Sequence, residues 1–199
     1  AITLHEVAHG WAALYFGDPT AKQLGRLTLN PIAHIDPLGT LLVPILMMIT
    51  TGFIFGWAKP VPVNWFNLKN PRRDMALVAL AGPGANFVMA LLWAVVVKLC
   101  LLLADPTTNQ IAQFFWYAGQ AGVFINVILM VLNLLPIPPL DGSRVLTSMV
   151  SPAVANTLAS IEVYGFVILV ILLVTGVLSQ IITPPIQFFV MLIRAIVGI

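Results

Sequence analysis

Three long apolar runs limit this chain to folds that lie within a lipid bilayer. They cover residues 75–103, 111–135 and 161–182, and a shorter run at 186–199 follows two prolines. About 20 apolar residues form a helix long enough to cross a bilayer. Only 8% of the residues are charged, against roughly 25% in a soluble domain. We therefore expect an all-α polytopic membrane protein without a separate soluble domain.

The apolar stretches predict a bundle of about five to six transmembrane or re-entrant helical segments. Residues 39–57 are the ambiguous stretch, because Pro44, Gly52 and Gly56 interrupt their apolar sequence. The stretch is long enough to span the bilayer once. Its interruptions favour a hairpin that re-enters on the side it left, and we expect the re-entrant form.

Two short stretches beside this segment have the character of strands. Residues 24–30 alternate with a period of two, which predicts a short strand. Residues 59–63 contain two prolines, which would confine an extended segment to the edge of a sheet. We therefore expect a small strand pair near the membrane face.

The domain organisation follows from the same apolar pattern. We expect one integral-membrane domain over residues 1–199, with a catalytic core in residues 1–150 and membrane helices in residues 160–199. The first apolar stretch, residues 1–16, is shorter than a spanning helix and ends at a Gly-Asp-Pro sequence. We expect that the N-terminus is truncated and that further sequence precedes this stretch.

The positive charges predict how the chain is oriented. Lys59, Lys69, Arg72 and Arg73 lie in one loop, and loops rich in Lys and Arg face the cytoplasm. Following the chain from this loop places Asp141 on the cytoplasmic side of the cell membrane. The sequence has no continuous basic run, so we expect no nucleic-acid partner.

A histidine pair near the start of the chain indicates a metal site. His5 and His9 are four residues apart, so on a helix they project from one face, one turn apart. Two imidazoles at this spacing can hold zinc, with Glu6 beside them as the general base. A helix can also carry such residues by chance. In an apolar run, however, ionisable side chains are candidates for function.

Asp141 is the candidate for the third metal ligand. Two histidines and one carboxylate leave a coordination position open for water, which is typical of catalytic zinc sites. Pro136, Pro138 and Pro139 cannot continue a helix, so the backbone before Asp141 is predicted to be unwound. Unwound backbone at membrane depth must be buried in protein or line a wet cavity. The alternative is a solvated aspartate in an interfacial turn, and we favour the ligand.

The chain resembles the site-2 protease family of intramembrane zinc metalloproteases, peptidase M50. Three signatures carry the resemblance: HEVAH at residues 5–9, AGPGAN at 81–86, and NLLP with LDG within 133–142. GRLTLNP at 25–31 and GWAKPVPV at 56–63 resemble the compact prokaryotic branch of that family.

The resemblance implies an activity and a set of roles. It implies one zinc ion per chain held by His5, His9 and Asp141, with Glu6 as catalytic base. It also implies peptide-bond hydrolysis in or near a transmembrane helix of a membrane-protein substrate, in contact with the lipid bilayer. The alternative function is an inactive or non-proteolytic metal-binding membrane protein, such as a metal transporter.

Two further features are candidates for contact with substrate. Asn86 either hydrogen-bonds a neighbouring helix or holds the substrate or the oxyanion, and we favour the second role. Leu27, Thr28 and Leu29 lie in the expected strand, where an unwound substrate would add as a further strand. A purely structural strand is an equally weighted alternative.

Three other polar residues receive lesser roles. We expect His34 to make an interfacial hydrogen bond and Asn133 to satisfy backbone that Pro136 leaves unpaired. Glu162 would be the third ligand in the runner-up class, a zinc protease whose HExxH site faces water, but no motif surrounds it.

Overall fold

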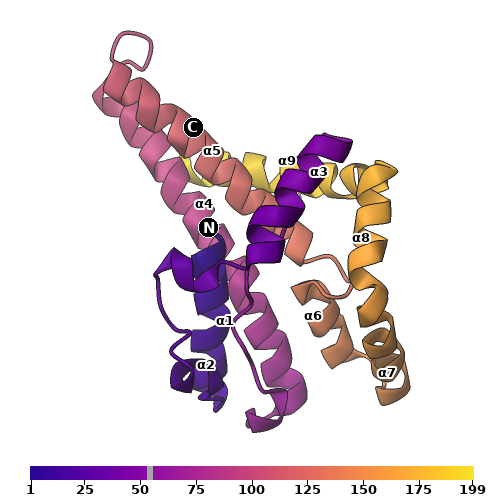
Figure 1. The fold of residues 1–199 in the computed structure, drawn as a ribbon. Helices are drawn as coiled ribbons and strands as arrows, with labels where there is room; N and C mark the ends of the chain where they lie inside the picture. The colour runs from indigo at the N-terminus through magenta and orange to yellow at the C-terminus, as the bar shows by residue number, and fades with distance from the viewer. Residues whose placement is uncertain (53–55) are drawn as a thin grey trace.

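The computed structural model describes residues 1–52 and 56–199, and the regular structure within them is helical (Figure 1). In chain order the elements are α1 (Ile2–Phe16), α2 (Thr20–Gln23), η1 (Pro31–His34), η2 (Pro37–Leu42), α3 (Val43–Thr51), η3 (Trp65–Asn67), α4 (Pro71–Leu103), α5 (Gln110–Asn133), α6 (Asp141–Met149), α7 (Pro152–Ile161), η4 (Glu162–Tyr164), α8 (Gly165–Val174) and α9 (Val177–Val197). η1, η3 and η4 are 3-10 helices, and η2 is a π-helix.

Four of the described helical segments are long and apolar enough to cross a membrane. They are α4, α5, the stretch Pro152–Val174 that contains α7 and α8, and α9. This confirms the expected all-α polytopic membrane protein.

α4 and α5 form a long antiparallel hairpin whose turn projects beyond the other helices, and α4 also contacts α1, α6 and α9 (Figure 1). Asn109 caps α5 by accepting hydrogen bonds from two backbone N–H groups of its first turn. Gly119 and Gly122 let α5 approach α4 closely, because a Cβ at either position would collide with Val97 or Trp93. α9 packs across the hairpin, and its Ile193 lies in the buried core with Ala90, Ala94, Val123 and Val127.

α1 packs along the N-terminal half of α4. It ends at Gly17, whose φ of 114° suits only a glycine. The next residue, Asp18, is fully buried and accepts hydrogen bonds from the backbone of Asn64 and the side chain of Asn67. Asp18 therefore ties the segment before α4 to the end of α1.

The expected strand pair is wrong: in residues 1–52 and 56–199 the structure contains no β-strand. Residues 24–30 and 59–63 do approach each other, but the guanidinium of Arg26 joins them by donating to the carbonyls of Ala33 and Lys59. Pro60 and Pro62 have no N–H to give to a ladder. The N–H of Val61, between them, donates to Glu6 instead.

The two described ends of the 39–57 segment lie next to each other. η2 and α3 carry the chain outward, and the N–H of Trp57 then donates to the carbonyl of Gly39, 2.9 Å away. Adjacent ends are what the re-entrant alternative requires. The part of that expectation that falls on residues 53–55 lies outside the described residues.

α6 packs on α4 on the side away from α1, and α7 and α8 follow α6 on that same side (Figure 1). Glycines allow the irregular segment before α6 to pack closely. A Cβ at Gly142 would collide with the carbonyls of Leu134 and Leu135, and a Cβ at Gly165 would collide with that of Pro138. The start of α8 therefore rests directly on the proline-rich segment that leads to Asp141.

Candidate metal centre

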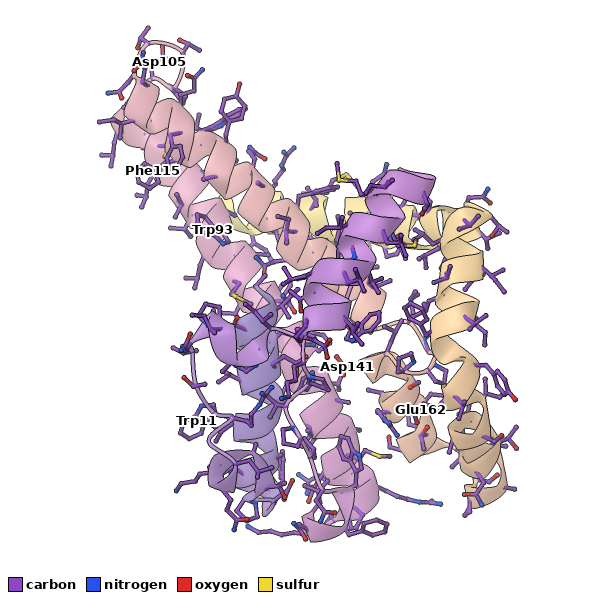
Figure 2. The ribbon with its side chains drawn as sticks, viewed as in Figure 1. Trp11, Trp93, Asp105, Phe115, Asp141 and Glu162 are labelled. Atoms are coloured by element: carbon purple, nitrogen blue, oxygen red, sulfur yellow. The ribbon has the colours of Figure 1, made fainter. Side chains whose placement is uncertain are left out.

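α1 and α6 bring three potential metal ligands together. His5 and His9 lie one turn apart on the buried face of α1, and Asp141 is the first residue of α6 (Figure 2). Their ligand atoms all lie within 4.8 Å of one another. The two histidine Nε2 atoms are 3.0 Å apart, and Asp141 Oδ2 lies 3.2 Å from His5 Nε2 and 3.3 Å from His9 Nε2.

This arrangement fits a zinc ion. Ligand atoms about 2.0–2.2 Å from a tetrahedral zinc lie roughly 3.3 Å apart, close to the three separations here. Asp141 Oδ2 is buried and has no hydrogen-bond partner, although a buried carboxylate oxygen needs a donor or a cation. Two nitrogens and one carboxylate oxygen also form a common donor set for catalytic zinc.

Both histidines are held by their other ring nitrogen. His5 Nδ1 lies 2.5 Å from Asn86 Oδ1, and His9 Nδ1 lies 2.7 Å from the carbonyl oxygen of Val78. An acceptor at Nδ1 keeps the proton there and leaves the lone pair of Nε2 free for a metal. α4 supplies both acceptors, so it orients both imidazoles.

Gly82 of α4 provides the space for the imidazoles. A Cβ at this position would lie 2.6 Å from His5 Nε2 and would also overlap His9 Nε2. Real side-chain contacts at such distances do not occur. Glycine at position 82 therefore allows α1 to bring both histidines against α4.

Glu6 lies beside the three ligands and is also held in place. Its Oε2 accepts a hydrogen bond of 2.7 Å from the backbone N–H of Val61. Glu6, the two histidines and Asp141 line the same cavity, which has a volume of about 500 Å³. Glu6 therefore shares a cavity with the three ligands while its Oε2 is fixed by the backbone.

The other residues singled out in the sequence lie in different surroundings. Asn86 is fully buried between His5 and Asn126, and Asn133 lines the cavity while its Nδ2 donates to the carbonyl of Leu129. His34 is buried, and its Nε2 lies 2.9 Å from the carbonyl oxygen of Thr28, a partner in the same loop region. Its expected interfacial role stays a prediction.

The remaining candidates do not join the three ligands. Leu27, Thr28 and Leu29 lie in irregular chain, and Leu29 is exposed. Their pairing with substrate depended on a strand that the described structure lacks. Glu162 also lines the cavity, but it forms an ion pair with Arg144, which gives that carboxylate a partner other than a metal.

Sequence reasoning missed Asn126, which completes the hydrogen bonds of Asn86. Its signal was available, because an asparagine in the middle of an apolar spanning helix needs a partner inside the protein. The carbonyl of Val78 carried no such signal. A backbone acceptor becomes a partner of His9 only when α1 and α4 pack together.

Comparison with known proteins identifies relatives along most of the chain. Residues 102–175 match the sequence profile of Peptidase family M50. The chain is 40% identical over 188 residues to a Bacillus subtilis protein named "Putative zinc metalloprotease YwhC", covering 92% of this chain and 81% of that protein.

Two mycobacterial proteins are more distant relatives. Both are named "Putative zinc metalloprotease Rip2". The Mycolicibacterium smegmatis protein is 36% identical over 90% of this chain and 66% of its own length. The Mycobacterium tuberculosis H37Rv protein is 32% identical over 90% of this chain and 65% of its own length. No solved structure matches the chain significantly.

Proposed function

Because the chain belongs to peptidase family M50, the site-2 protease family, and is therefore an intramembrane zinc metalloprotease, we propose that His5, His9 and Asp141 hold one zinc ion per chain and that Glu6 is the catalytic base. One observation carries this assignment. The ligand atoms of His5, His9 and Asp141 lie together, and the buried Asp141 Oδ2 among them has no hydrogen-bond partner.

The chemistry divides between the ion and the protein. Zinc, when bound, acts as a Lewis acid that activates water and polarises a peptide carbonyl. His5 and His9 bind through Nε2, because Asn86 and Val78 occupy their Nδ1 atoms. Asp141 adds the negative charge, and the buried setting strengthens its attraction for a cation.

Glu6 moves the proton. Its Oε2 is fixed by Val61 N–H, so Oε1 accepts the proton of the attacking water and then delivers it to the nitrogen of the leaving amine. A carboxylate held at one oxygen loses little freedom when the other oxygen reacts, which favours a defined proton path.

The proposed substrate is a transmembrane helix of another membrane protein. The proposal is supported by the length and apolar composition of α4, α5, the Pro152–Val174 stretch and α9, because transmembrane helices are the peptide chains available within a bilayer. A metal transporter is not favoured, because His5, His9 and Asp141 are the single group of this type found in residues 1–52 and 56–199. A transport path would need several such groups in succession.

The test compares two glutamates of the same cavity. The purified protein in detergent is assayed for zinc content and for cleavage of a helical transmembrane peptide, as wild type, Glu6→Gln and Glu162→Gln. Loss of the general base is expected to lower turnover at least about 100-fold with about one zinc still bound per chain. Glu162→Gln is expected to keep its zinc.

Cleavage by Glu6→Gln at the wild-type rate would exclude Glu6 as the base. Asp141→Asn separates the proposed ligand set from the runner-up. If Asp141→Asn keeps its zinc while Glu162→Gln loses it, Glu162 is the third ligand and Asp141 is not.

A further inference from the structure

Asn126 is a buried polar residue that the proposed mechanism does not yet use. It lies in the middle of α5, a helix apolar enough to span the membrane, and only 2% of its surface is exposed. A buried amide is costly unless its hydrogen bonds are satisfied. Which of its atoms donate and which accept shows which neighbouring group Asn126 orients.

Asn126 connects α5 to His5 through Asn86. Asn126 Nδ2 lies 2.8 Å from the carbonyl oxygen of Gly122, Asn126 Oδ1 lies 2.9 Å from Asn86 Nδ2, and Asn86 Oδ1 lies 2.5 Å from His5 Nδ1. The path therefore runs from a backbone carbonyl of α5, through two buried side chains, to a ring nitrogen of α1.

The carbonyl of Gly122 determines the direction of every bond in this path. A carbonyl oxygen only accepts, so the atom of Asn126 beside it must be the NH₂ group, and the other atom must be the oxygen. That oxygen requires a donor from Asn86, which turns the oxygen of Asn86 toward His5. His5 Nδ1 must then carry a proton, and in the neutral imidazole Nε2 presents its lone pair.

His9 shows why His5 needs such a path. The proton of His9 is placed directly by the carbonyl of Val78, which can only accept. His5 meets an amide, and an amide can rotate to present either a donor or an acceptor. Without Asn126, Asn86 would be free to turn its NH₂ group toward His5 and place the proton on Nε2, where it would block a metal.

We propose that Asn126 is a positioning residue that, through Asn86, keeps His5 in the tautomer that binds metal. This inference rests on the proposed zinc site and adds α5 to the elements that build it. The class of ligand concerned is a divalent cation that prefers neutral imidazole nitrogen, such as zinc.

The first measurement is made on the metal-free protein in detergent. With only three histidines in the sequence, ¹⁵N-labelled histidine gives few ring signals, and His5→Ala identifies those of His5. Wild type is expected to show one His5 species, protonated at Nδ1. A His5 ring protonated at Nε2 in wild type would overturn the inference, whatever any variant does.

The variants separate positioning from packing. Asn126→Leu keeps the approximate size of the side chain and removes both of its polar atoms. Asn126→Asp keeps an acceptor for Asn86 Nδ2. Gln120→Leu is the control, because it removes a different polar contact of α5, the one with Arg194. Asn126→Leu is expected to give mixed His5 tautomers and to bind zinc about 10- to 100-fold more weakly, as loss of an outer partner does. Asn126→Asp and Gln120→Leu are expected to stay within about threefold of wild type, since the outer partner of His5 is kept.

A residue that serves only to join α4 and α5 would behave differently. Asn126→Leu would then melt at a lower temperature but keep one His5 tautomer and the wild-type zinc affinity, and this result would contradict the proposal. The tautomer is measured without zinc and without substrate. It therefore distinguishes failure of this inference from failure of the proposed protease mechanism, which would appear in wild-type zinc content and cleavage.

Discussion

At the scale of single residues, the proposed metal centre depends on the missing side chain of a glycine as well as on its ligands. Gly82 and Gly84 are two residues apart in α4, but only Gly82 faces the histidines. A Cβ at Gly84 would have no neighbour within 4 Å. The two glycines therefore form a matched pair in which one substitution is tested against the other.

Gly82→Ala is expected to lower zinc affinity at least about 10-fold, because the added methyl group pushes both imidazoles away from Asp141. Gly84→Ala is expected to leave zinc binding unchanged and to stabilise the helix by about 0.5–1 kcal/mol, since alanine favours a helix more than glycine does. Zinc content after dialysis against a metal buffer measures the first effect, and thermal unfolding measures the second. Equal zinc binding by both variants would show that Gly82 plays no special part.

The sequence was sufficient to nominate the ligands because their signals are local. The spacing of His5 and His9 alone puts them on one helix face. The prolines before Asp141 predict unwound chain at membrane depth. Asn126 and the carbonyl of Val78 act through tertiary contacts. The sequence of one segment does not predict which atom of another segment will lie against it in the folded protein.

At the scale of elements, residues 61–67, which precede α4, are held in place by hydrogen bonds to side chains rather than by a sheet. The carboxylate of Asp18 accepts from Thr20, Asn64 and Asn67. Burial alone would raise the pKa of Asp18, but these hydrogen bonds outweigh it and hold the pKa below its usual value. Val61, which positions Glu6, lies in this same segment.

Lowering the pH is expected to release this segment. Because the pKa of Asp18 is lower in the folded than in the unfolded chain, its stabilisation is complete above the ordinary aspartate pKa of 3.8 and is lost as pH falls through the lower folded value. Thermal unfolding in detergent between pH 3 and pH 7 is expected to show this loss in wild type.

Asp18→Asn is expected to remove that pH dependence and to destabilise the protein at pH 7 by about 1–3 kcal/mol, because its amide group faces a backbone donor. Asp105→Asn is the control. Hydrogen bonds from Thr107 also lower the pKa of Asp105, but Asp105 lies exposed in the turn between α4 and α5. A larger effect at Asp105 than at Asp18 would contradict a buried anchoring role for Asp18.

The strand pair could not have been excluded from sequence alone. Period-two alternation in residues 24–30 is a real strand signal, and the prolines of residues 59–63 allow an edge strand. The deciding fact is that Glu6 takes the N–H of Val61 and Arg26 takes nearby carbonyls. Both are side chains from other segments, so local propensity does not reveal them.

At the scale of the whole molecule, α4 is the longest described helix and carries basic residues in its first turn. Its 33 residues form a helix about 50 Å long, which exceeds the roughly 30 Å hydrocarbon core. Lys69, Arg72 and Arg73 are exposed at its first end, and the α4–α5 turn at its other end has no basic residue. We propose that the basic end is cytoplasmic and that the metal centre lies toward that side of the cell membrane.

Labelling of single cysteines tests this orientation. Cys100 is the single cysteine of the sequence, and Cys100→Ser removes it. In this background, Lys69→Cys is expected to react with a membrane-impermeant maleimide in inside-out vesicles and to be protected in right-side-out vesicles. Thr108→Cys, in the turn at the other end of the α4–α5 hairpin, is expected to show the reverse. Labelling of both cysteines from the same side would show that α4 does not cross the membrane.

The three proposed ligands come from α1 and α6, which are far apart in the sequence and each pack on α4. A bound ion would therefore act as a cross-link that closes a loop of more than half the chain. An ion that binds only the folded chain stabilises it in proportion to the logarithm of its free concentration over Kd. During synthesis the proposed centre cannot form until α6 has followed α4 and α5 out of the ribosome and docked on α4, so the three ligands come together only after this central hairpin is in place.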